Sequence, residues 1–186
     1  MNLKVLDMSE TGNSDFNKVS AQELPKRHRR NNYKVFRNLA VLDRKDKKHF
    51  LEMLKGQFGF EEKLDYIFFI NNKNKIYIVN KDLAAIDFSK LRLNSVGLYI
   101  AEQRNDEARL SIEGSQMIGP LAKRNVIEIT RQEAREWLKG KDLEKEVDTQ
   151  GFVIIRSEDD YLGCGRVSKG KILNFVPKTR RLNVSD

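Results

Sequence analysis

Residues 151–176 read GFVIIRSEDDYLGCGRVSKGKILNFV, and this stretch decides the fold of the C-terminal third of the chain. Three runs in it, GFVIIR, YLGCGRV and KILNFV, contain many β-branched and aromatic residues. Such runs favour β-strands, and the short polar segments SEDD and SKGK between them favour turns. The stretch therefore predicts three consecutive antiparallel strands joined by tight turns.

The residues just upstream predict one strand and one helix. NVIEI at 125–129 is typical of a strand, and Thr130 with Glu133 three positions later forms a capping box at a helix start. We expect this helix to end near Gly140, with Ala134, Trp137 and Leu138 facing inward. One helix with several short antiparallel strands in about 65 residues favours a sheet that curls into a small barrel, because curling removes exposed strand edges.

The middle of the chain predicts a second unit. A helix is expected after Asp43 and a cap at Gly59, because Phe50, Leu51, Leu54 and Phe58 recur at helical spacing. LDYIFFIN with KIYIV, and VGLYIAEQ with ARLSI, each predict a hairpin. Short helices are expected over 81–88 and 114–118, and a short strand is possible over 3–6. Gly119-Pro120 interrupts both helix and strand, so we place a boundary there.

The fold class is therefore expected to be α+β. We assign 1–37 to a basic, flexible extension, 38–120 to a small mixed α/β domain and 121–186 to the barrel-like domain. The extension lacks any sustained hydrophobic period, and Gly, Ser, Asn and Asp dominate its first part.

The basic charge is concentrated in two blocks. Residues 26–48 hold ten Lys or Arg and two Asp, and residues 166–181 hold six basic residues and no acid. Because the whole chain carries +8, the remainder carries −6. Clustered cations favour a polyanionic partner, since binding releases counterions from phosphates. A merely solubilising surface is the alternative.

The residues argue against most catalytic chemistry. GRVSKGK at 165–171 lacks the Ser or Thr after Lys171 that a phosphate loop needs, and a strand follows it. Gly163 and Gly165 are better explained by a bend in a strand than by backbone contact with RNA. Cys164 is the single cysteine and is expected to be a small core residue, and one Cys with two His makes no metal set. The aromatic residues Trp137, Phe50, Phe58, Phe68, Phe69 and Phe152 are spaced as core residues.

We expect no cofactor, no membrane segment and a reducing, cytoplasmic location.

Two long segments resemble known domains. RNVIEITRQEAREWLKGKDLEKE at 124–146, followed by GFVIIRSEDDYLGCGRVSKGKILNFVPKTRRL at 151–182, resembles a PUA domain, the RNA-binding pseudo-barrel of pseudouridine synthases and archaeosine transglycosylases. KIYIVNKDL and LRLNSVGLYIAEQRNDEARLSIEGSQMIGPLAKRNV are similar to the pre-PUA domain of Nip-type ribosome biogenesis proteins. ILNFVPKTRRL is similar to the tails of Nop/Sun/Fmu-related RNA cytosine methyltransferases.

The resemblance covers about residues 42–182 and implies which residues touch RNA. In PUA-like domains the end of the helix, the turn after it and the last strand form the RNA face. The residues of this chain that fall there are Lys139, Gly140, Lys141, Lys169, Lys171, Lys178, Arg180 and Arg181. In the N-terminal extension, Arg27, Arg29 and Arg30 form a basic cluster that could order on RNA, dock a protein or only aid solubility.

We therefore expect a non-catalytic RNA-binding protein, a ribosome biogenesis or rRNA-processing factor that recognises structured rRNA or pre-rRNA. The alternative is a protein–protein adaptor in an RNA-modification or ribosome-assembly complex, with the pre-PUA-like domain as the docking surface. A third hypothesis, an RNA-modifying enzyme, requires a pocket of buried ionisable residues, and the sequence shows none.

Overall fold

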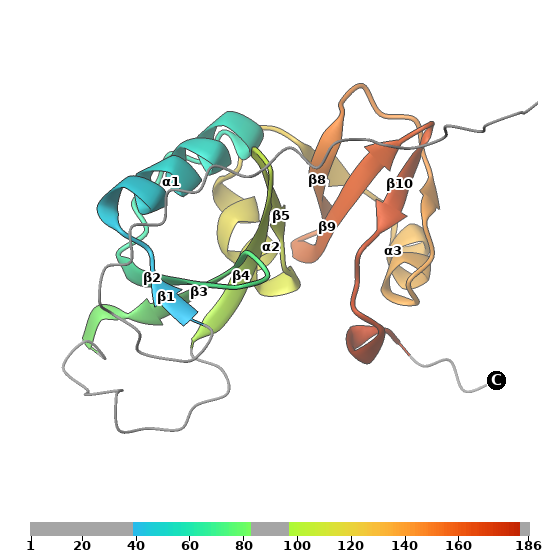
Figure 1. The fold of residues 1–186 in the computed structure, drawn as a ribbon. Helices are drawn as coiled ribbons and strands as arrows, with labels where there is room; N and C mark the ends of the chain where they lie inside the picture. Colours follow the sequence, from blue (N-terminus) through green and yellow to red (C-terminus); the bar gives the residue numbers. More distant parts are fainter. Residues whose placement is uncertain (1–38, 83–96, 183–186) are drawn as a thin grey trace, which may run out of the picture. The chain divides into compact units, whose positions relative to one another are not determined.

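The computed structural model describes residues 39–82 and 97–182, which form two five-stranded sheets with three α-helices (Figure 1). The possible strand over 3–6, the basic cluster of the extension and most of the helix expected over 81–88 lie outside the described residues. The α+β fold class predicted from the sequence is confirmed.

The first sheet is an antiparallel meander in which every strand pairs with its neighbour in the chain. Both hairpins expected from the sequence are present. Its strands are β1 (Leu39–Val41), β2 (Tyr66–Asn71), β3 (Lys75–Asn80), β4 (Leu98–Arg104) and β5 (Glu107–Leu110). The edge strand β1 is too short to be recognised by an alternating pattern, and the sequence analysis did not predict it.

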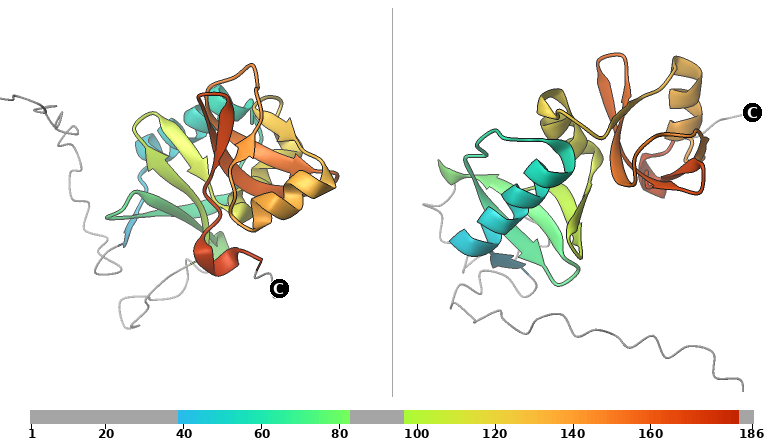
Figure 2. Two further views of the ribbon diagram at one scale, coloured as in Figure 1. Left: turned by 90° about the vertical axis from the view of Figure 1, so that its right-hand side faces the viewer. Right: turned by 90° about the horizontal axis from the view of Figure 1, so that it is seen from above.

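Helix α1 (Arg44–Phe58) packs on one face of this sheet, as Figure 2 shows from above. Asp43 caps its start by accepting a hydrogen bond from the Asp46 N–H at 2.8 Å, and Gly59 ends it in the left-handed conformation. Both limits agree with the prediction. The buried face differs slightly, because Met53 is buried where Leu51 is only half-buried.

The link between the sheets is helical. Helix α2 (Ile112–Ile118) is capped by Ser111, whose hydroxyl accepts a hydrogen bond from the Gly114 N–H at 2.9 Å. The chain then continues directly into a 3-10 turn, η3 (Gly119–Leu121), with Pro120 near its start. The domain boundary placed at this proline stays a prediction.

The second sheet has the order β6-β8-β9-β10-β7. The strands β8, β9 and β10 are the three predicted from residues 151–176, but β6 pairs with β8 in parallel, so the expectation of antiparallel strands throughout is wrong at this edge. The strand bounds are β6 (Val126–Glu128), β7 (Leu143–Glu144), β8 (Gly151–Ser157), β9 (Asp160–Ser168) and β10 (Lys171–Asn174).

Helix α3 (Arg131–Leu138) lies between β6 and β7 in the chain and covers one face of the second sheet (Figure 2). The predicted capping box is present: the Thr130 hydroxyl accepts from the Glu133 N–H at 3.2 Å, and Glu133 accepts from the Thr130 N–H at 2.7 Å. Trp137 is fully buried and donates its indole N–H to the Leu162 carbonyl at 3.1 Å. The indole is therefore a core group, as its spacing predicted.

Strand β8 is buried on both faces, which explains its continuous apolar run. Phe152 and Ile154 belong to a core shared with α1 and the first sheet, whereas Val153 and Ile155 belong to the core under α3. A strand covered on both sides has no solvent face, so it has no alternating polar positions. Strand β8 thus contributes to two apolar cores, one on each of its faces.

Gln57 near the end of α1 connects the two sheets by hydrogen bonds. Its side-chain amide donates to the carbonyls of Ala108, at 3.0 Å, and Phe152, at 3.4 Å, and its oxygen accepts from the Ala108 N–H at 2.8 Å. These bonds satisfy polar groups at the rim of a packed core and fix β5 beside β8.

The glycines of β9 have structural roles. Gly163 adopts a φ of +111° at the irregularity in the β8–β9 pairing, a conformation that side chains strongly disfavour. A Cβ on Gly165 would lie 2.9 Å from the Trp137 ring. The expected bend is thus present at Gly163, whereas Gly165 pairs in regular register with Val153 and allows close packing against Trp137.

The remaining aromatic residues assigned to the core, Phe50, Phe58, Phe68, Phe69 and Phe152, are all at most 3% exposed. Cys164 is buried too, as expected. In the described parts of the chain, no helix has the length and apolar character needed to cross a membrane.

Candidate nucleic-acid interface

The lysines at the end of α3 are paired with acids. Lys139 and Lys141 both bind the carboxylate of Glu136, the first at 2.8 Å. These two hydrogen bonds lower the pKa of Glu136 to about 2, so the carboxylate is charged at any physiological pH. One carboxylate thus compensates half of the positive charge of these two lysines.

Gly140 lies between these lysines and contacts the C-terminal segment. Its φ is +90°, and a Cβ at this position would overlap the guanidinium of Arg181. Arg181 is only half exposed and donates from Nε to the Val176 carbonyl at 3.0 Å, and the Leu182 N–H donates to the Leu138 carbonyl at 2.9 Å. The chain after β10 thus folds back along the end of α3, and Arg181 helps to hold it there.

The two lysines of the β9–β10 turn differ from each other. Lys171 pairs with Glu144 of β7 at 3.3 Å. Lys169 is exposed, adopts a φ of +50° in the turn and has no ion pair among the described residues. Lys178, in the 3-10 turn η4 (Lys178–Arg180), is likewise exposed without an ion pair there. Lys169 and Lys178 are thus predicted RNA-binding lysines with uncompensated charge.

Arg180 points to a different region. Its guanidinium pairs with Glu113 of α2 at 2.7 Å. The structure therefore brings Gly140 and Arg181 together beside Lys139 and Lys141, whereas Arg180 binds an acid of a different helix. Arg27, Arg29 and Arg30 lie outside the described residues.

A cavity of about 180 Å³ lies where Arg180 meets the first sheet. Three cationic side chains line it, and Glu113 is the one acidic residue in its wall. Its other walls come from β3, β4, β5, β9 and the segment after β10. We call six of the lining residues the cavity cluster: Lys75, Tyr99, Arg109, Glu113, Phe175 and Arg180.

Cations stack on aromatic rings throughout this cluster. The Lys75 ammonium lies 5.0 Å from the centre of the Tyr99 ring, and the Arg109 guanidinium lies 5.0 Å from the centre of the Phe175 ring. Both distances are typical of cation–π contacts. Phe175 itself is 36% exposed, so part of this residue is open to solvent.

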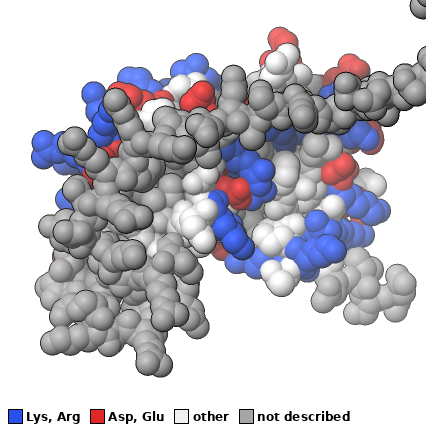
Figure 3. Space-filling model, viewed as in Figure 1, with Lys and Arg blue, Asp and Glu red and all other residues white. Residues whose placement is uncertain are grey.

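The row of stacked groups continues onto β8 and β9. Phe175 contacts Phe152 edge-on with 5.8 Å between ring centres, and the Arg166 guanidinium lies 5.0 Å from the centre of the Phe152 ring. Alternating Arg and aromatic groups are the composition with which proteins hold unpaired bases and phosphates. In the space-filling view, basic side chains lie on both sides of an uncharged area near the centre of this face (Figure 3).

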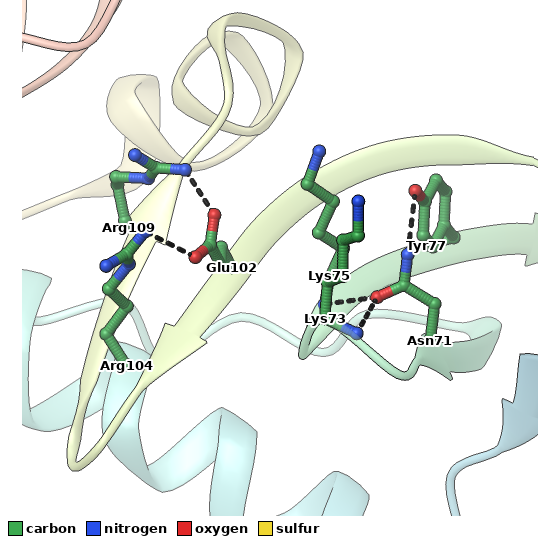
Figure 4. A network of polar contacts seen from close by, with 7 residues as sticks. All are labelled: Asn71, Lys73, Lys75, Tyr77, Glu102, Arg104 and Arg109. Atoms are coloured by element: carbon green, nitrogen blue, oxygen red, sulfur yellow. Dashed lines mark hydrogen bonds and ion pairs between the residues drawn. The ribbon is translucent and has the colours of Figure 1, made fainter. Parts of the chain in front are cut away.

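A polar network on β3, β4 and β5 orients part of this surface (Figure 4). Glu102 binds Arg104 at 2.7 Å and also binds Arg109, so one carboxylate serves two guanidinium groups. Lys73 and Lys75 lie beside this network (Figure 4), and among the described residues their ammonium groups make no ion pair. The strands therefore present more positive than negative charge at this edge.

Asn71 shapes the turn that carries these lysines. Its side-chain oxygen accepts from the backbone N–H groups of Lys73 and Lys75, both at 2.9 Å, and its amide donates to the Tyr77 hydroxyl at 3.5 Å. Such an Asn-stabilised turn holds the backbone of both lysines in one position, and the Lys75 ammonium lies over the Tyr99 ring.

Cys164 lies in the wall of the cavity but is a poor nucleophile. Burial raises the pKa of its thiol to about 12, so the reactive thiolate is scarce at neutral pH. Within the described residues, no group of three or more His, Cys, Asp or Glu side chains could hold a metal ion.

The cavity cluster was not predicted from the sequence. One signal was available: Ala108 and Leu110 are buried, so the alternation of β5 places Arg109 on the opposite face. Other residues that line the same cavity come from positions as distant as Lys75 and Arg180, and only the fold brings them together with Arg109.

Comparison with known proteins supports the assignment of the second sheet. Residues 124–182 match the family model described as the methyltransferase RsmF PUA domain. Over about 90 residues, the chain is 32% identical to ribosomal RNA small subunit methyltransferase F of Aeromonas salmonicida and 27% identical to that of Vibrio parahaemolyticus. Each match covers 48% of this chain and only 19–20% of the relative.

The chain thus spans about a fifth of the length of the curated relatives it matches. These relatives are rRNA methyltransferases, in keeping with the resemblance of the C-terminal segment to RNA cytosine methyltransferase tails. The resemblance of the first sheet to the pre-PUA domain of Nip-type proteins stays a prediction. The PUA domain expected from the sequence is confirmed over residues 124–182, where the chain is similar to the PUA domain of methyltransferase RsmF.

Proposed function

We propose that this protein binds structured rRNA or pre-rRNA through its PUA domain and acts in ribosome biogenesis or rRNA processing without catalysing a reaction itself. The observation that carries the proposal is the match of residues 124–182 to a PUA domain whose relatives act on ribosomal RNA. The block of six basic residues without an acid over 166–181 lies within that domain.

The binding is electrostatic in its first step. Lys169 and Lys178 carry uncompensated charge in the described structure, so they can pair with phosphates without breaking an existing ion pair. Lys139, Lys141 and Lys171 would first have to leave Glu136 or Glu144. We therefore rank Lys169 and Lys178 above the other predicted RNA-binding residues in their contribution to affinity.

The non-catalytic part of the proposal rests on the chemistry of the described residues. Cys164 lies in the wall of the cavity, and its thiol is protonated at neutral pH. The cavity cluster holds cations and aromatic rings rather than the paired acid and base that proton transfer requires.

The proposal is tested by measuring the affinity of the full chain for small-subunit rRNA fragments, with the double variant Lys169→Ala, Lys178→Ala beside it. We expect this variant to bind more weakly and to lower the slope of log affinity against log salt by about 1 for each lysine removed. The matched control is Lys45→Ala, Lys63→Ala, which removes two exposed lysines outside the PUA domain. If both double variants lose the same RNA affinity, the interface is not specific to the PUA domain. If the native chain binds no RNA, the alternative of a protein–protein adaptor is favoured.

A further inference from the structure

Two hollows of the described structure differ in charge. The open hollow between α3 and β7 is lined by four acids, Glu133, Glu136, Asp142 and Glu144, and by a single lysine, Lys141. The cavity cluster instead has three cations and one acid, and that acid, Glu113, is already bound to Arg180. An anionic ligand is therefore repelled from the first hollow and attracted to the second.

The size of the cavity limits its occupant. Its 180 Å³ is below the roughly 300–1,000 Å³ of pockets that enclose a drug-sized ligand. A single planar group fits this space, whereas a duplex does not. The rings of Tyr99 and Phe175 and the guanidinium of Arg109 are flat surfaces of the kind on which a planar group stacks.

The exposure of Phe175 indicates the direction of entry. More than a third of this side chain is open to solvent, although it packs on Phe152 and carries Arg109 on its ring. A base inserted beside it would bury the remaining apolar surface. Lys178 follows Phe175 by three positions in the chain. It is exposed, and phosphates are expected to bind there.

We propose that the cavity cluster receives one unpaired nucleotide of the RNA that the PUA domain binds. Its base stacks on Phe175 and Tyr99, and its phosphate lies near Lys75 and Arg180. This inference rests on the proposed function, because it requires RNA to be bound nearby. It goes beyond that function by predicting that the protein distinguishes a stem with an unpaired base from a fully paired stem.

The test uses two RNA stems of equal length, one fully paired and one carrying a single bulged 2-aminopurine. We expect the native chain to bind the bulged stem about tenfold more tightly, since stacking on an aromatic side chain has a corresponding magnitude. We also expect the fluorescence of the 2-aminopurine to fall on binding, because a stacked base is quenched.

Variants of Phe175 separate stacking from folding. Phe175→Leu keeps an apolar group against Phe152 but removes the flat ring, and we expect it to bind both stems equally. Phe175→Tyr restores the ring and should restore the preference. Lys178→Gln, a neighbouring change outside the cavity, should weaken both stems to the same degree and leave their ratio unchanged. Thermal unfolding of each variant shows whether the fold is retained.

The outcomes distinguish the two proposals. If neither stem binds the native chain, the proposed function itself is wrong. If both stems bind with equal affinity, or if the preference persists in folded Phe175→Leu, RNA binding stands and the cavity proposal is overturned. A third outcome is that an acidic peptide displaces the bulged stem and binds the native chain but not the Phe175→Leu variant. This result would assign the cavity to a protein ligand and would also overturn the cavity proposal.

Discussion

The guanidinium of Arg180 lies 2.7 Å from the carboxylate of Glu113, although 67 positions separate the two residues in the sequence. This ion pair joins the 3-10 turn after β10 to helix α2, at the rim of the cavity cluster. It therefore connects the C-terminal end of the PUA domain with the element that follows the first sheet.

The pair should make stability depend on pH. Partial burial acts to raise the pKa of Glu113, but hydrogen bonds from its own backbone N–H and from Arg180 together lower that pKa below the ordinary 4.5. A carboxyl with a lowered pKa in the folded state stabilises the fold above its unfolded pKa and loses this contribution as the pH falls through the folded value. The contribution of the pair is thus present at pH 7 and lost in acid.

We expect Arg180→Gln to lower the free energy of unfolding by less than about 1 kcal/mol at pH 7, because the arginine side chain is about half exposed. At pH 3 the difference from the native chain should shrink. Urea unfolding at both pH values checks this, with Lys178→Gln as the control from the same turn. A larger deficit at pH 3 than at pH 7 would mean that the ion pair is not the cause.

Glu136 is expected to restrain RNA binding by occupying two lysines. Glu136→Gln removes the charge that holds Lys139 and Lys141, so both ammonium groups become available to phosphates. We predict a severalfold increase in RNA affinity, with a steeper salt dependence. Glu128→Gln, which removes an exposed acid on β6, is the matched control for net charge. If both variants gain the same RNA affinity, the increase reflects the overall charge and not the release of Lys139 and Lys141.

Gly140 should tolerate no side chain. Gly140→Ala forces a Cβ into a left-handed conformation and against the Arg181 guanidinium, which must move. We expect a loss of about 1–3 kcal/mol in the free energy of unfolding. Gly56→Ala is the control, since Gly56 lies within α1 with open space around it and should gain about 0.5–1 kcal/mol. Equal effects of the two changes in urea unfolding would contradict the packing described for Gly140.

Cys164 should be inert while the protein is folded. Its thiol is buried and its pKa is raised to about 12, so a thiol reagent at pH 8 meets almost no thiolate. We expect labelling only as fast as the protein opens, and full labelling in denaturant. Rapid labelling of folded protein would show that the wall of the cavity opens readily around β9.

Local signals account for what the sequence predicted well. Asp43 with Gly59, and Thr130 with Glu133, act within one helical turn, so their caps were recognisable before any fold was known. The run GFVIIR at 151–156 likewise predicted a strand, and β8 occupies these residues. Each of these features depends on residues that are close in the sequence.

Features that depend on distant residues were not predicted. The parallel pairing of β6 with β8 joins Val126 to Ile154, and nothing in either strand specifies direction. The pairing of Lys139 and Lys141 with Glu136 converts expected phosphate ligands into internal ion pairs. The cavity cluster unites Lys75 of β3 with Arg180 near the end of the chain, so only the assembled fold reveals it.

The most direct test of the central claim is the affinity of the full chain for a small-subunit rRNA fragment and for duplex DNA of equal charge, measured between about 50 and 200 mM salt. If the PUA domain recognises structured RNA, the RNA should bind more tightly than the DNA, and this ratio should persist at the higher salt while both affinities fall. Equal affinities that vanish together with salt would show non-specific attraction to phosphate and would contradict the account.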